Sequence, residues 1–390
     1  MVLGLFAVLV LAPVYRFLIP RTLYREAVVL GSLAALAVYD VRLPLLVLGV
    51  TFALFLLMRL LTSGSSGHGP LVASVGLSAL GALFIWNKLA GGQMAVLPTQ
   101  GGLAFLGVSY LVLKVAAALV ETNRGGIRQF SFTEVLAWIV FLPTYPSGPM
   151  EDFEHFRSQQ PTFSRATVLG GMERILFGLV KALIVAHYLG TWVQPILAAP
   201  WDHQRFELLL GLYAVSLRFY FDFSGYSDIA IGLGALYGYD IEENFDNPLI
   251  RRNLVQLWQR WHMTLTRWLR LYLFIPVSRR IIRHGGRAGE YLGIAAGQIV
   301  AMTFCGLWHG LSWNFALWGL LQALGLIWVG VVCREVGRRL PSRLVLWWRQ
   351  SHVAYVLSTV ITFNAFSVSC VFLVGDVSTA LVYFHQLLRP

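Results

Sequence analysis

Charged side chains are scarce in this sequence. They make up only 13% of the residues, whereas 57% are hydrophobic, and a soluble domain is usually about one quarter charged. A water-facing fold of this composition would expose large apolar patches. The apolar runs are also long and continuous, as in 43–61, 71–89 and 353–374, which favours spanning helices over the alternating strands of a barrel. We therefore predict an all-α integral membrane protein.

Cysteine is rarer still, and sequence motifs for nucleic-acid binding are missing. The three cysteines, Cys305, Cys333 and Cys370, are an odd and scattered set, which argues against a disulfide framework. The net charge of +11 comes without a zinc finger or an aromatic–basic platform, so no nucleic-acid partner is predicted. The positive-inside rule for membrane loops explains the excess of arginine more simply.

We interpret the chain as one polytopic membrane domain, 1–390, because it contains no convincing internal repeat and no polar stretch long enough to fold alone. The first run is taken as a span rather than a removed signal peptide, because it has no basic start and no clear cleavage site. Each full crossing needs about 20 apolar residues. The candidate spans are 2–19, 27–39, 43–61, 70–90, 101–120, 134–143, 172–198, 206–238 with a break at Gly225, 254–277, 291–310, 312–333, 353–374 and 377–388.

Arginine clusters predict an orientation. The segment 251–287 contains nine arginines and no acidic residue, and 334–349 contains five arginines and one glutamate. Both should face the cytoplasm, and 251–287 is predicted to be a basic helical segment on that side. The intervening 291–333 is long enough for a hairpin of two crossings, whose middle, 306–312, would lie toward the opposite face.

Polar residues inside apolar segments mark candidate functional sites. In 306–319, His309 lies between Trp308 and Gly310 and is a candidate general base, because a buried imidazole stays neutral and can accept a proton. A purely structural interhelical hydrogen bond is the alternative, and a nucleophilic pair with Cys305 is a further one.

A second cluster lies in 256–276, where His262 is expected within a helix rich in arginine and tryptophan. This helix can be read as an amphipathic segment anchored at the membrane interface or as a basic surface that attracts an anionic donor, and both readings can hold together. A third cluster, 217–234, carries Arg218, Asp222 and Asp228. Residues four apart share a helix face, so this cluster is either a neutralised structural network or part of an ion pathway.

Taken together, these clusters resemble the membrane-bound O-acyltransferase (MBOAT) family. The matching text is YFDFSGYSDIAIGLGALYG, then ENFDNPLIRRNLVQLWQRWHMTLTRWLR, then GLWHGLSWNFALWGLLQAL, with FLPTYPSGPMEDFEHF upstream. Within the family, the sequence looks most like the bacterial branch that modifies surface polymers, by D-alanyl transfer to teichoic acid or by O-acetylation of alginate. One departure is Leu271, which stands where bacterial relatives usually carry an aspartate beside Arg270.

The resemblance implies about eleven transmembrane helices plus re-entrant helices around a central tunnel, in the cell membrane of a bacterium. It implies catalytic roles for His309 and His262. A thioester donor, either acyl-CoA or the phosphopantetheine arm of an acyl carrier protein, would arrive from the cytosol, and the hydroxyl would belong to an extracytoplasmic polymer or a partner protein. No permanent cofactor and no metal are expected. The predicted substrate-binding residues are Trp258, Arg260, Trp261, Trp308, Asn247 and Asp228.

Two other classes of function stay open at this point. A transporter or flippase for a lipid-linked glycan would also use intramembrane charges, although such proteins often show repeated halves. A non-catalytic scaffold of a cell-envelope modification complex is the third reading.

Overall fold

The computed structural model describes residues 19–63, 69–89, 107–283 and 285–389. Every regular element within these ranges is helical, and none of the residues in them lies in a strand. The predicted all-α fold is therefore confirmed. The contacts between residues divide the chain into two compact units. One comprises Met1–Gly178 and Tyr226–Glu242, and the other comprises Leu179–Gly225 and Glu243–Pro390. We call them unit 1 and unit 2.

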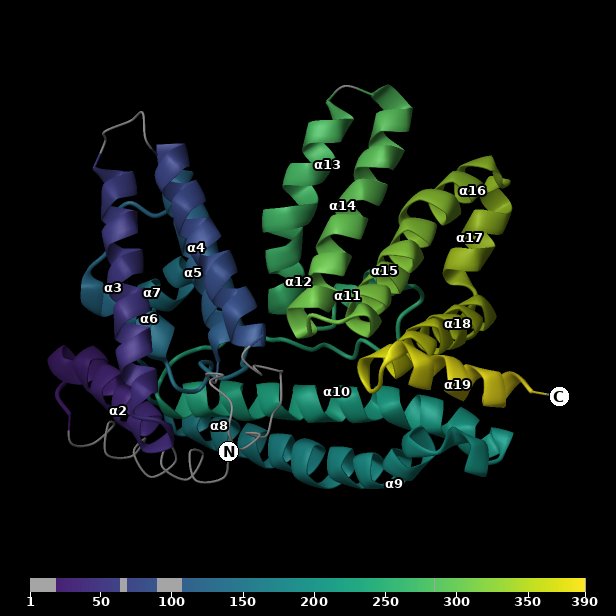
Figure 1. The fold of residues 1–390 in the computed structure, drawn as a ribbon, viewed down its shortest axis with the longest axis horizontal. Helices are drawn as coiled ribbons and strands as arrows, with labels where there is room; N and C mark the ends of the chain where they lie inside the picture. The colour runs from purple at the N-terminus through teal and green to yellow at the C-terminus, as the bar shows by residue number, and fades with distance from the viewer. Residues whose placement is uncertain (1–18, 64–68, 90–106, 284, 390) are drawn as a thin grey trace. The chain divides into compact units, whose positions relative to one another are not determined.

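Unit 1 contains most of the N-terminal helices, drawn in purple and blue in Figure 1. After the short turn η1 (Arg21–Leu23), they are α2 (Tyr24–Tyr39), α3 (Arg42–Thr62), α4 (Gly69–Leu89), α5 (Val108–Asn123), α6 (Phe132–Val140), α7 (Phe153–Ser158) and α8 (Arg165–Leu179). The C-terminal part of the long helix α10 (Arg205–Leu236) also belongs to this unit.

Two short helices of unit 1 begin where the sequence provides a cap. Ser131 and Glu134 form a capping box at the start of α6, and Asp152 accepts hydrogen bonds from the backbone N–H groups of Glu154 and His155 at the start of α7. Such caps satisfy amide groups that have no partner inside the helix. The polar sequence between α6 and α8 therefore folds into defined structure.

Unit 2 contains the remaining elements. They are η2 (Val180–Val185), α9 (Ala186–Ala198), η3 (Pro200–Asp202), the first part of α10, α11 (Leu254–Trp258), α12 (Met263–Leu269), η4 (Arg270–Phe274), α13 (Ile275–Ile282), α14 (Gly286–His309), α15 (Trp313–Ile327), η5 (Trp328–Cys333), α16 (Arg334–Arg339), α17 (Ser342–Gln350), α18 (His352–Cys370), η6 (Val371–Leu373) and α19 (Val377–Leu388).

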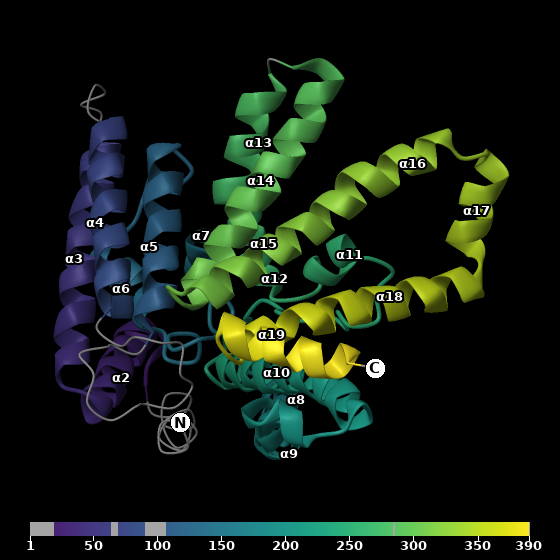
Figure 2. The ribbon, with the colours of Figure 1, turned by 45° about the vertical axis from the view of Figure 1, so that its right-hand side comes forward.

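Helices α14 and α15 form the hairpin that 291–333 predicts, and they lie side by side in both ribbon views (Figures 1 and 2). Glycine makes their close approach possible. A Cβ on Gly306 would lie 2.1 Å from the carbonyl oxygen of Phe315, and one on Gly319 would lie 2.3 Å from that of Met302. Both contacts are with backbone atoms, so neither position tolerates a side chain without moving a helix. The hairpin turn follows directly after His309.

Five helices of the described residues are long and apolar enough to cross a membrane: Arg42–Thr62, Gly69–Leu89, Ala288–His309, Trp313–Arg339 and His352–Leu373. They agree with five of the predicted spans. The first candidate span, 2–19, lies almost entirely outside the described residues, as does the start of 101–120. The count of about eleven spans and the central tunnel stay predictions.

Two expectations about helix continuity are wrong. The single helix expected over 254–277 is interrupted, because His262 adopts a left-handed backbone with φ of 43° between α11 and α12. Conversely, α10 continues through Gly225 without the expected break. A glycine in a helix interior costs only about 1 kcal/mol relative to alanine, which the neighbouring hydrogen bonds of a 32-residue helix readily offset.

Candidate active site

His309 is the last residue of α14, and aromatic rings surround it. Its ring centroid lies 5.0 Å from that of Trp308 and 5.4 Å from that of Trp318, whose plane is perpendicular to it. The ring of Phe315 lies nearly parallel at 6.5 Å. His309 itself is half-buried. The hairpin turn thus holds this imidazole among apolar rings while leaving part of it accessible.

His262 also lies close to Trp308. The ring of Trp308 is 6.4 Å from that of His262, and Phe223 packs edge-on against His262 at 4.6 Å. His262 is only 2% exposed. It lies outside the five apolar spans, and burial, together with the nearby His309, holds its pKa well below the usual range. The two predicted catalytic histidines, 47 positions apart in the sequence, therefore contact one indole ring.

Asn244 is a residue of this region that the sequence did not single out. Its side-chain oxygen lies 3.1 Å from Nδ1 of His262 and accepts hydrogen bonds from the backbone N–H and the hydroxyl of Thr264, at 3.3 and 3.0 Å. The only signal in the sequence is an asparagine in a polar stretch between two apolar helices. Such a stretch ordinarily indicates a loop, so the pattern by itself points to no partner.

The predicted substrate-binding residue Trp258 belongs to a buried polar chain. Its indole N–H donates to Gln322 at 3.0 Å, and the amide nitrogen of Gln322 donates to Ser369 at 2.6 Å. The Trp258 ring also lies 6.0 Å from Trp318, which faces His309. Gln322 and Trp318 were not predicted as site residues, although a glutamine in the apolar helix α15 is the kind of intramembrane polar group that marks function.

Three other predicted substrate-binding residues, Arg260, Asn247 and Trp261, lie in unit 2 near Asp246 and Phe245. The guanidinium of Arg260 pairs with the carboxylate of Asp246, and Arg251 approaches the same carboxylate at 3.5 Å. Asn247 has a left-handed backbone with φ of 44° and donates to Asp246 at 3.4 Å. Trp261 packs against Phe245 at 5.2 Å. Asp246 thus neutralises part of the positive charge expected of a basic surface.

The acidic residues of α10 have basic partners. Asp228, which was predicted to bind substrate, pairs with Arg174 at 2.9 Å within unit 1. In unit 2, the Arg218 charge interacts with Asp222, and the Arg218 guanidinium packs closely against Gly190. These pairs support the reading of the third cluster as a neutralised structural network.

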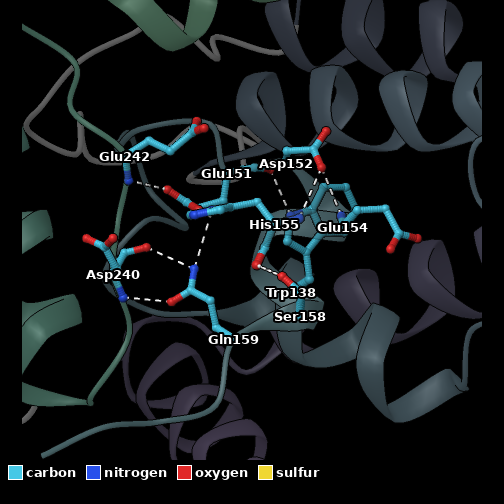
Figure 3. Close-up of polar contacts among 9 residues, drawn as sticks. All are labelled: Trp138, Glu151, Asp152, Glu154, His155, Ser158, Gln159, Asp240 and Glu242. Carbon is cyan, nitrogen blue, oxygen red and sulfur yellow. Dashed lines mark hydrogen bonds and ion pairs between the residues drawn. The ribbon is translucent and has the colours of Figure 1, made fainter.

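A second polar cluster, around the buried Glu151, lies in unit 1 (Figure 3). The side chain of Glu151 is fully buried, accepts a hydrogen bond from the backbone N–H of Glu242 at 2.7 Å, and pairs with Nδ1 of His155 at 2.9 Å. Gln159 bridges to Asp240 through two hydrogen bonds, at 2.9 and 2.7 Å. The carboxylate of Glu151 raises the pKa of His155. This histidine carried no supporting pattern in the sequence.

The fold and the site define a helical integral membrane protein in which two histidines from different segments lie in one cluster of aromatic rings. The model of the membrane-bound O-acyltransferase (MBOAT) family matches residues 51–373. Because this match covers most of the chain, the protein belongs to that family, as the motifs around His262 and His309 indicate.

Several relatives come from the predicted bacterial branch. The chain is 31% identical over 238 residues to the teichoic acid D-alanyltransferase of Streptococcus thermophilus, which covers 59% of this chain and 57% of that protein. It is 31% identical over 217 residues to the probable alginate O-acetylase AlgI of Azotobacter vinelandii, covering 55% and 42%. With the teichoic acid D-alanyltransferase of Bacillus subtilis, the identity is 27% over 273 residues, covering 68% of each. The chain thus spans about half the length of the first two relatives.

Proposed function

We propose that this protein is an O-acyltransferase of the bacterial cell membrane that moves an acyl group from a cytosolic thioester to a hydroxyl on the outer side. The observation that carries the proposal is the contact of His262 and His309 with the same Trp308 ring. The names of the relatives support the reaction class and two acyl groups, D-alanyl and acetyl.

In this reaction the oxygen of the acceptor hydroxyl attacks the thioester carbonyl carbon. A C–O bond forms and the C–S bond breaks, so the thiol is the leaving group. His309 removes the hydroxyl proton during the attack and passes it to the departing sulfur, which balances the step. A half-buried ring at a helix end suits this role, because one side remains open to a substrate.

The donor is proposed to be acyl-CoA or an acylated carrier protein, both of which present the same phosphopantetheine thioester. The cationic segment 251–287 would receive it at the cytoplasmic face through charge attraction. Arg260 and Trp261 directly precede His262 in this segment. The acceptor is proposed to be a surface polysaccharide, a teichoic acid-like polymer or a partner protein. Asn247 and Asp228 stay predicted substrate-binding residues.

The test is acyl transfer by purified protein reconstituted in lipid vesicles, with radiolabelled acyl-CoA and an acylated carrier protein as alternative donors. We expect His309→Ala to lower the rate by about 10²- to 10⁴-fold, the usual contribution of a general base. His352→Ala is the matched control, because His352 is exposed at the start of α18 and should keep the parental rate. Undiminished transfer by His309→Ala would remove the proposed role.

The same vesicles separate this proposal from a transporter or a scaffold. A transporter would move an intact substrate across the membrane without forming an ester, whereas a scaffold would show no transfer unless a second protein were added. The ion pair of Asp228 with Arg174 and the charge interaction of Asp222 with Arg218 give neither alternative specific support.

A further inference from the structure

Asn244 is fully buried, with an exposed fraction of 0%, and it lies in the extended segment between α10 and α11. Its side-chain oxygen accepts hydrogen bonds from the backbone N–H and the hydroxyl of Thr264. Its backbone oxygen accepts a hydrogen bond from the N–H of Met263 at 2.9 Å. One residue therefore binds the positions on the C-terminal side of His262 through both its backbone and its side chain.

These contacts assign the atoms of the Asn244 amide. A backbone N–H can only donate, so the atom facing the amide of Thr264 must be the oxygen. The same oxygen faces Nδ1 of His262 at 3.1 Å. Because that oxygen can only accept, Nδ1 must carry the hydrogen and donate it. In a neutral imidazole the other nitrogen, Nε2, is then the acceptor.

The same contacts also explain why the backbone of His262 is left-handed. A left-handed conformation in a non-glycine residue costs about 1–3 kcal/mol and persists only when the surroundings determine it. Here the hydrogen bonds from Met263 and Thr264 to Asn244 hold the chain immediately after His262. The ring is further confined by Phe223 and Trp308, so its orientation and its tautomer have the same origin.

We propose that Asn244 is the positioning residue of the active site, and that it holds His262 as a neutral Nδ1–H tautomer whose Nε2 accepts a hydrogen bond during acyl transfer. This inference rests on the proposed function. It assigns His262 to binding an N–H or O–H group of a substrate, such as the amide N–H groups of the phosphopantetheine arm. In this form His262 does not donate a hydrogen bond from Nε2 to the thioester carbonyl oxygen, because a neutral ring with its hydrogen on Nδ1 has no donor at Nε2.

The direct test is the ¹⁵N NMR spectrum of protein labelled in histidine, in detergent micelles, with His262→Gln used to assign the signals. In the parent we expect His262 to show the Nδ1–H form. In Asn244→Ala, the Nε2–H form should become populated, since it is the more common form of a free imidazole. A His262 signal that stays in the Nδ1–H form in Asn244→Ala would overturn the proposal.

A second variant covers the case in which Asn244→Ala does not fold. Asn244→Asp keeps the shape and the acceptor oxygen but adds a negative charge next to Nδ1–H, which favours the charged imidazole. We expect His262 in this variant to become protonated at a higher pH than in the parent. The titration must be followed together with that of His309, the ionisable group whose charge acts on His262. A titration identical to the parent's would contradict the proposal.

Kinetics then separate positioning from plain structural support. Thr264→Val removes one hydrogen bond to the same oxygen but leaves the contact with His262, so it should keep the tautomer and most of the rate. Asn244→Ala should lower kcat by about tenfold or more, as expected when a histidine loses its correct tautomer. Equal losses in both variants, with no change of tautomer in either, would indicate a structural role only.

The two proposals fail in different ways. If Asn244→Ala does not change the tautomer of His262, the role of Asn244 is contradicted, while the effect of His309→Ala on the rate still stands. Absence of acyl transfer in the parent contradicts the proposed function, while the spectra still report on the Asn244–His262 contact.

Discussion

His262 and His155 each contact a side-chain oxygen through Nδ1, and the two contacts have opposite consequences. His262 in unit 2 meets the neutral amide of Asn244 and is almost completely buried. His155 in unit 1 meets the carboxylate of Glu151, and its side chain is 37% exposed. An amide orients an imidazole without charging it, whereas a carboxylate stabilises the charged form. The comparison separates a histidine suited to proton and hydrogen-bond chemistry from one suited to an ion pair.

The largest expected difference between the two histidines is in catalysis. We expect His262→Ala to lower the rate of acyl transfer by about 10²-fold, because the substrate group that Nε2 would hold loses its orientation. The rate of His155→Ala should stay within about twofold of the parental rate. The partners of His155, Glu151 and Gln159, bind backbone groups of unit 1 and so serve its structure. Both rates are measured in the vesicle assay. A comparable loss in His155→Ala would break the distinction.

Replacing the carboxylate of unit 1 should have an intermediate effect, on stability. Glu151→Ala leaves the buried N–H of Glu242 without its acceptor, and such a loss costs about 1–3 kcal/mol. Glu151→Gln retains an acceptor and serves as the matched control, so it should lose less. Denaturant or thermal unfolding of micelle-embedded protein measures both. If Glu151→Ala were as stable as the parent, the buried hydrogen bond to Glu242 would contribute nothing.

The smallest expected effect is on the pH dependence of stability. The pKa of His155 lies above its ordinary value of 6.5 because of Glu151. A group whose pKa is raised on folding stabilises the protein fully below its unfolded pKa and loses that contribution as the pH rises through the folded pKa. The burial of Glu151 raises its pKa as well, so the contribution of Glu151 to stability begins to fall at lower pH, above its ordinary pKa of 4.5. The thermal midpoint should therefore fall as the pH rises above 6.5.

His155→Gln tests this pH effect, because glutamine keeps a hydrogen-bond donor for Glu151 but does not titrate. Its thermal midpoint should fall less steeply above pH 6.5 than that of the parent. A parallel pH dependence in the two proteins would assign the effect to another group. Asn244 and His262 should not contribute here, because burial keeps His262 neutral over this range.

Much of the fold follows from the sequence alone. The long apolar runs predict the helical membrane fold, and the spans at 43–61, 70–90, 291–310, 312–333 and 353–374 correspond to the five apolar helices. The hairpin around 306–312 follows from arginine clusters at both ends and two crossings between them. The family and its two histidines can be recognised in the sequence because each motif, RWH at 260–262 and WHG at 308–310, consists of consecutive residues.

The sequence by itself thus determined that the protein lies in a membrane, where most of its apolar helices are, and which two histidines matter. These features depend on composition and on neighbouring residues. Only the tertiary structure decided that His262 lies in a turn, that Asn244 faces it from 18 residues away, and that one tryptophan contacts both histidines. Helix propensity favours a continuous helix through 254–277. The helix is nevertheless interrupted at His262, because buried hydrogen bonds to Asn244 offset the cost of the left-handed backbone there. A periodic pattern along the chain contains no information about such a partner.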